Sequence, residues 1–159
     1  MNDRSCKALT AVALALSVAG AAAQHPVLPR SLADFDFIDA LVIDDRESPL
    51  YGFHHFYVNG LGASALRQGG PYPVGSIFID LVYEVASEGK LTNEGEGVRF
   101  LMMSKDPEAA ATGQWWFAEF KADGSYVQQD VKSACFDCHA EVGERDFVFS
   151  RRLDPPFID

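Results

Sequence analysis

Basic residues are scarce in this chain, which has 13 lysines and arginines against 23 acidic residues among its 159 and a formal net charge of −10 at pH 7. A protein this acidic repels the phosphates of nucleic acids and of anionic membrane surfaces. The charge argues against both as partners, and it permits a basic redox protein or a small uncharged or cationic ligand. Internal repeats are also missing, so the mature chain is expected to fold as one domain.

Apolar runs long enough to cross a membrane are absent from the sequence. The longest, residues 8–18, falls short of the roughly 20 residues that a bilayer requires. It follows two basic residues and precedes three alanines that end at Ala23, which is the order of a secretory signal peptide. The sequence therefore predicts a signal peptide over residues 1–23, a mature domain over residues 24–159 and a periplasmic or secreted location.

Cysteine is rare, and its distribution is informative. Cys6 belongs to the predicted signal peptide, which leaves Cys135 and Cys138 with His139 directly after them. This spacing is the attachment signature of a c-type haem, because two sulfurs on one helical turn can form thioethers with two vinyl groups while the histidine ligates the iron. Zinc would need four ligands, and there is no second cysteine pair. A disulfide would leave His139 unexplained. We predict one covalent haem c, with His139 as the metal ligand.

Methionine, a common second axial ligand of small helical cytochromes, does not occur after His139. Met102 and Met103 lie in a segment predicted to be a strand, where a core role is favoured. Long segments with a 3.6-residue period are missing as well, which argues against a four-helix cytochrome. The pattern favours an iron with one open face. A plain electron carrier whose sixth position is filled by His54 or His55 is the alternative.

Short aromatic and β-branched segments make up most of the mature chain, and they predict a mainly β, α+β fold built on an antiparallel sheet. The expected strands are residues 53–58, 75–84, 98–103 and 115–120. The expected helical segments are residues 32–38 after an N-cap at Ser31, residues 61–67, and residues 132–139 with the haem cysteines. Residues 87–97, which contain three glycines, are expected to form a turn region.

Among the predicted strands, residues 76–84 show the clearest alternation of apolar side chains. Its odd-numbered residues from 77 to 83 are apolar, whereas Asp80 and Glu84 share the other face with Phe78. That face either reaches solvent or lines a pocket. Inside a haem pocket, burial would raise the pKa of Asp80, and its carboxyl group could act as a general base or gate protons. Glu84 and Glu119 are expected on solvated faces.

His54 and His55 point to opposite faces of their predicted strand, so at most one of them can face a pocket. Each is equally compatible with a core or surface role in which its hydrogen bonds are satisfied. A His54 that faces the iron could donate a hydrogen bond to a bound ligand or coordinate weakly.

Several segments, taken in order, make the chain similar to the cytochrome P-460 family, which includes the cytochromes c′-beta. They are the haem motif, residues 56–59, Gly75-Ser76, Ser104-Lys105-Asp106, Trp115-Trp116-Phe117 and Asp146-Phe147-Val148-Phe149. The resemblance implies a compact antiparallel β fold, often dimeric, with one haem c and a five-coordinate iron that is open on its distal side.

Members that oxidise hydroxylamine have a lysine on the long strand that is linked covalently to the haem. In this chain the corresponding position falls on Asp80, and their distal arginine falls near His54. The cytochromes c′-beta lack that link and bind gases such as nitric oxide in a pocket walled by phenylalanines. The phenylalanines available here are Phe53, Phe56, Phe78 and Phe100. The resemblance thus implies binding or conversion of a small nitrogen oxide or diatomic ligand, with hydroxylamine oxidation as an alternative.

Overall fold

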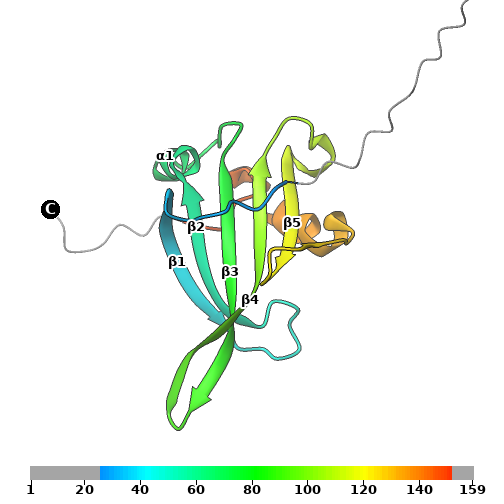
Figure 1. The fold of residues 1–159 in the computed structure, drawn as a ribbon. Coiled ribbons are helices and arrows are strands. Elements are labelled where there is room, and N and C mark those ends of the chain that lie inside the picture. Colours follow the sequence, from blue (N-terminus) through cyan, green and yellow to red (C-terminus); the bar gives the residue numbers. More distant parts are fainter. Residues whose placement is uncertain (1–25, 152–159) are drawn as a thin grey trace, which may run out of the picture.

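A single antiparallel sheet dominates the computed structural model, which describes residues 26–151 (Figure 1). Within that part of the chain the six strands lie in sequence order, each beside the next. They are β1 (Phe35–Ile43), β2 (Gly52–Asn59), β3 (Ile77–Glu88), β4 (Leu91–Lys105), β5 (Trp115–Lys121) and β6 (Tyr126–Val127). The predicted mainly β fold with an antiparallel sheet is confirmed.

The helical segments are short. Helix α1 (Gly60–Gln68) begins at Asn59, whose side chain accepts a hydrogen bond from the Gly62 amide, and it ends at Gly69 in the left-handed conformation. A one-turn helix, η1, spans Ala110–Thr112. The predicted C-terminal helix forms as three consecutive segments, η2 (Lys132–Phe136), α2 (Asp137–His139) and η3 (Ala140–Arg145).

Strand β1 replaces the helical segment predicted at residues 32–38. The Ser31 hydroxyl does accept a hydrogen bond from the Ala33 amide, but the turn closes at once with a bond from Phe35 N–H to the Leu32 carbonyl. From Phe35 onward the backbone pairs with β2 instead. The prediction was wrong because local N-cap chemistry competes here with a neighbouring strand that supplies a hydrogen-bonding partner for the backbone.

The region 87–97, predicted to be a turn, is mostly a hairpin. Ser87 pairs with Thr92 and Val85 with Glu94, so only the tip of the β3–β4 hairpin turns. Figure 1 shows this hairpin extending beyond the rest of the sheet. A Cβ added at Gly95 would lie 3.0 Å from the Cβ of Glu84, so this glycine allows close approach of the two strands and does not mark a turn.

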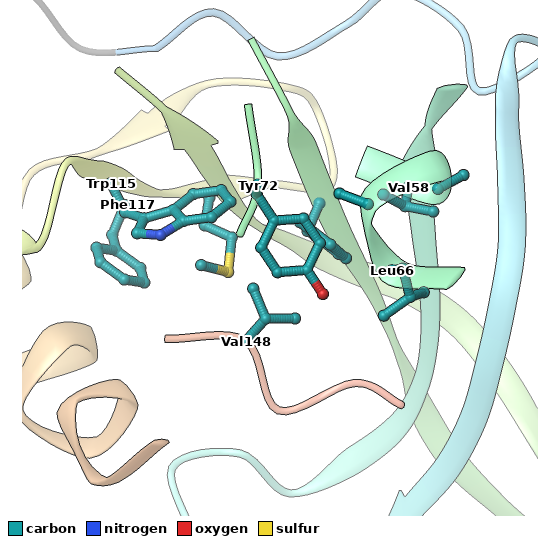
Figure 2. Close-up of a cluster of buried hydrophobic side chains, with 10 residues drawn as sticks. Val58, Leu66, Tyr72, Trp115, Phe117 and Val148 are labelled. Atoms are coloured by element: carbon teal, nitrogen blue, oxygen red, sulfur yellow. The ribbon is translucent and has the colours of Figure 1, made fainter. Parts of the chain in front are cut away.

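Each face of the sheet carries its own apolar cluster. On one side, Phe78 and Trp115 belong to a buried cluster that also receives Cys135 and Phe136 from the C-terminal helix. We call this the helix-facing side of the sheet. Figure 2 shows Tyr72 and Trp115 over the strands there, with Val148 from the C-terminal segment close by. The other side is covered partly by Leu28 and Leu32 of the N-terminal segment.

The described helices are all too short or too polar to cross a membrane. The predicted signal peptide, residues 1–23, lies outside the described residues.

Candidate haem site

Strand register places the side chains of the helix-facing side in cross-strand rows. The row nearest α1 is buried and consists of Val58, Phe78, Met103 and Phe117. The next row is only half-buried, and we call it the middle row. It consists of Phe56, Asp80, Leu101 and Glu119. The sheet therefore presents a half-buried surface of mixed polarity beside its packed core.

Cys135 and Cys138 lie within one turn of the C-terminal helix. Cys135 is half-buried against the core cluster, Cys138 is exposed, and both thiols are free. Burial, with a smaller contribution from the Glu119 carboxylate, raises the pKa of the Cys135 thiol to about 11.

His139 has the geometry of a metal-binding histidine. Its Nδ1–H donates a hydrogen bond of 2.7 Å to the Phe147 carbonyl, which leaves the lone pair of Nε2 for a metal. The ring packs beside Phe117 and Phe149, with centroids 5.0 and 5.1 Å away. Burial lowers the pKa of His139, and the bond to Phe147 opposes this only in part. The imidazole is therefore neutral near pH 7, as metal ligation requires.

His54 and Asp80 form a buried pair on the helix-facing side. His54 is only 1% exposed, and its Nδ1 lies 2.7 Å from Asp80 Oδ2 while its Nε2 lies 2.7 Å from the Leu50 carbonyl. Both ring nitrogens face oxygen acceptors, so the geometry favours an imidazolium that donates both bonds. The other carboxylate oxygen of Asp80, Oδ1, is buried and has no hydrogen-bonding partner among the described residues.

The pair holds its protons more tightly than isolated side chains do. Burial alone would lower the pKa of His54, but the hydrogen bond and charge of Asp80, together with the Leu50 carbonyl, raise it. Burial raises the pKa of Asp80, and the hydrogen bond and charge of His54 oppose this only in part. Asp80 is thus partly desolvated, and its nearest partner is His54.

The other predicted residues fall in different places. Phe78 lies in the core, with its ring centroid 5.1 Å from Tyr72 and 6.0 Å from Trp115. Of the four phenylalanines, register puts Phe56 and Phe78 on the helix-facing side, whereas Phe100 packs in the opposite cluster and Phe53 has the parity of that opposite side.

His55 also lies on the opposite side of the sheet, where its Nε2 is 2.6 Å from Glu94 Oε1. Glu84 is exposed as expected, but the expectation for Glu119 was wrong. Glu119 is only one-fifth exposed and lies 3.6 Å from the Arg99 guanidinium. Alternation along residues 115–121 could have found it, because Glu119 shares the parity of the buried Trp115 and Phe117.

These residues fit a covalently bound haem c. The donor set is two thiols on one helical turn and a neutral imidazole with a free Nε2, and the middle row on the helix-facing side of the sheet is half-buried. The unpaired buried oxygen of Asp80 marks the same row as able to take a further polar neighbour. Fold and site together define a c-type haem protein built on an antiparallel sheet.

Comparison with known families agrees with this definition. The model of the cytochrome P460 family matches residues 33–150, and the chain belongs to that family. Membership implies a haem c cytochrome. Comparison with curated proteins finds no match.

The His54–Asp80 pair predicts that stability decreases as the pH rises. The folded protein keeps a proton on His54 that the unfolded chain releases near pH 6.5, because the folded pKa is raised. We expect the contribution of the His54 proton to the free energy of unfolding to be complete below about pH 6.5 and to be lost as the pH rises through the folded pKa, by at most about 1.4 kcal/mol per pH unit.

Urea unfolding of the holoprotein between about pH 6 and about pH 9 measures this dependence. His54→Gln should flatten the decline, whereas His55→Gln, on the opposite side of the sheet, should keep it. A decline of equal slope in His54→Gln would show that another group titrates.

Proposed function

We propose that this protein is an exported mono-haem c cytochrome that binds or converts a small nitrogen oxide or other diatomic ligand at an open iron face. In this proposal residues 1–23 are removed on export, Cys135 and Cys138 would form the thioethers, and His139 would ligate the iron. Bound haem c supplies an iron that exchanges one electron and takes a ligand at its free position.

The observation that carries the proposal is the state of the candidate sixth ligands among the described residues. Both nitrogens of His54 are engaged with oxygen atoms, and His55 lies on the opposite side of the sheet with Glu94. Met103 is buried in the core of the helix-facing side, and Met102 is buried in the opposite cluster. None of these four side chains is poised to ligate an iron held by His139.

The middle row supports a ligand pocket of mixed character. Phe56 and Leu101 supply apolar surface that excludes water from a small uncharged ligand. The His54–Asp80 pair holds a proton on the same side of the sheet, and such a pair can deliver or accept a proton when the bound ligand changes its charge. Arg99 and Glu119 form the polar boundary of this surface.

Titration of the ferrous holoprotein with carbon monoxide and nitric oxide tests the proposal. We expect binding of one equivalent of each gas, followed by the Soret band. If the wild-type protein resists both gases while His54→Gln or His55→Gln binds them, the protein is an electron carrier with a filled sixth position.

An assay with hydroxylamine and an artificial electron acceptor tests the remaining alternative, which is hydroxylamine oxidation. Since Asp80 stands where the hydroxylamine-oxidising relatives have a lysine, we expect no turnover and an ordinary c-type Soret band. Turnover together with a strongly red-shifted Soret band would show a cross-linked haem and would overturn the proposal.

The proposed export is tested separately. Mass spectrometry of the protein purified with its own leader should give a chain that begins at Gln24. A mature chain that retains residues 1–23 would contradict export by signal peptide cleavage.

A further inference from the structure

A buried ion pair joins Lys105 to Asp146, the residue before Phe147, whose carbonyl accepts the hydrogen bond from His139. Lys105, at the end of β4, is only 8% exposed, and its Nζ donates a hydrogen bond of 2.5 Å to Asp146 Oδ1. The same ammonium lies 4.9 Å from the centroid of the Trp115 ring and donates a longer bond to the Gly113 carbonyl. Two opposite charges are thus held in a largely desolvated place.

Asp146 is fixed by more than this pair. Its second carboxylate oxygen accepts a hydrogen bond from the Tyr72 amide at 3.0 Å, and its carbonyl accepts one from Trp115 Nε1–H at 3.0 Å. The segments around Tyr72, Lys105 and Trp115 are all distant from Asp146 in the sequence, and each forms a hydrogen bond with it. That residue directly precedes Phe147, whose carbonyl accepts the hydrogen bond from His139.

The backbone at this point is strained. Asp146 and Phe147 have φ values of 53° and 66°, in the left-handed region that residues with side chains rarely adopt. The Phe147 ring also packs so closely on Gly113 that a Cβ there would lie 2.3 Å from it. Backbone hydrogen bonds from the Asp146 and Phe147 amides to the Gly143 and Val142 carbonyls close this turn, and the Lys105–Asp146 pair is the charged part of its surroundings.

We propose that Lys105 and Asp146 are a positioning pair, which holds the Phe147 carbonyl against His139 Nδ1–H and so sets the ligand strength of the axial imidazole. A well-aligned acceptor on Nδ1–H makes the imidazole more basic and fixes the ring orientation. Neither residue touches the reacting site, and their influence passes through the peptide between Asp146 and Phe147. The inference rests on the proposed axial role of His139.

Resonance Raman spectra and midpoint potentials of the holoprotein test the pair. Asp146→Asn and Lys105→Gln should both lower the frequency of the iron–histidine stretch in the ferrous protein, because each misaligns the carbonyl. Trp115→Phe replaces the indole with a smaller aromatic ring and removes the N–H donor to Asp146, and it should lower the frequency without any change of charge.

The midpoint potential distinguishes positioning from simple electrostatics. Loss of the Phe147 bond weakens the donor to the ferric iron and raises the potential, so both charge variants should raise it. A purely through-space effect would raise the potential in Asp146→Asn but lower it in Lys105→Gln, because that variant removes a positive charge.

Asp137→Asn is the matched control, since Asp137 pairs with Lys132 on the exposed surface of the same helix and lies two residues from His139. It should leave the stretching frequency unchanged. Unchanged frequencies in folded, haem-loaded Lys105→Gln and Trp115→Phe, or opposite potential shifts in the two charge variants, would overturn the positioning role. A wild-type protein without an iron–histidine band would instead contradict the open iron face, and the potential signs would still test the pair.

Discussion

Replacement of His139 by alanine is expected to abolish the stable holoprotein. The imidazole would supply the only protein ligand that we assign to the iron, and its ring also fills the space between Phe117 and Phe149. Loss of an outer-shell partner costs about 10–100-fold in metal affinity, so loss of the ligand itself should cost more. The measurement is the yield of haem-loaded, folded protein, by absorbance and by far-ultraviolet circular dichroism.

Cys138→Ala should give a related but milder result, a protein whose haem has at most one thioether. Denaturing mass spectrometry identifies that bond. His55→Ala is the control, because it removes a histidine from the opposite side of the sheet and should leave haem loading intact. Stable and doubly attached haem in Cys138→Ala, or full loading in His139→Ala, would refute the assignment of the motif.

Trp115→Ala is expected to cost about 3–5 kcal/mol of folding free energy. The indole is fully buried, contacts Tyr72 and Phe78 edge to face, and donates its N–H to the Asp146 carbonyl. The substitution removes that hydrogen bond and leaves a cavity in the core cluster that receives the C-terminal helix. Denaturant unfolding should show the loss, and the melting temperature should fall by more than about 10 °C.

Trp116→Ala provides a close comparison for this effect. Trp116 is the next residue on β5, so it points to the other side of the sheet, and it is only half-buried. Replacement of Trp116 should therefore reduce the folding free energy by clearly less than replacement of Trp115 does. Equal losses in the two variants, or a loss below about 1 kcal/mol for Trp115→Ala, would show that the core is not centred on Trp115.

Local patterns were sufficient to predict the haem motif and most strands. The spacing of Cys135, Cys138 and His139 is read within one helical turn, and the alternation of residues 76–84 correctly separated Asp80 and Phe78 from the odd-numbered residues on the opposite side of the sheet. Helix α1 was also close to its predicted limits. These features depend on neighbours a few residues away, where sequence patterns are most direct.

Features that depend on residues distant in the sequence were harder to predict from the sequence. Strand β1 forms because β2 lies beside it, and residues 87–97 pair across a hairpin because of how β3 and β4 are registered. The phenylalanines of the predicted pocket divide between the two sides of the sheet, which only the register of neighbouring strands decides.

The same limit applies to the surroundings of the site. His54 could be assigned to a core role or a pocket role from its strand, but its bonds to Asp80 and Leu50 required the fold. Lys105 and Asp146 are 41 residues apart, and each was noted only as part of a family segment. Charged pairs between distant segments have no periodic signal, so their roles emerge from the structure alone.

The coordination state of the ferrous iron tests the central claim most directly. Resonance Raman spectra of the purified, reduced holoprotein, recorded without added ligand, report the spin state and the number of axial ligands. An iron held by His139 alone predicts a five-coordinate, high-spin spectrum with an iron–histidine stretch. A six-coordinate, low-spin spectrum would contradict the open iron face and with it the proposed binding of small ligands.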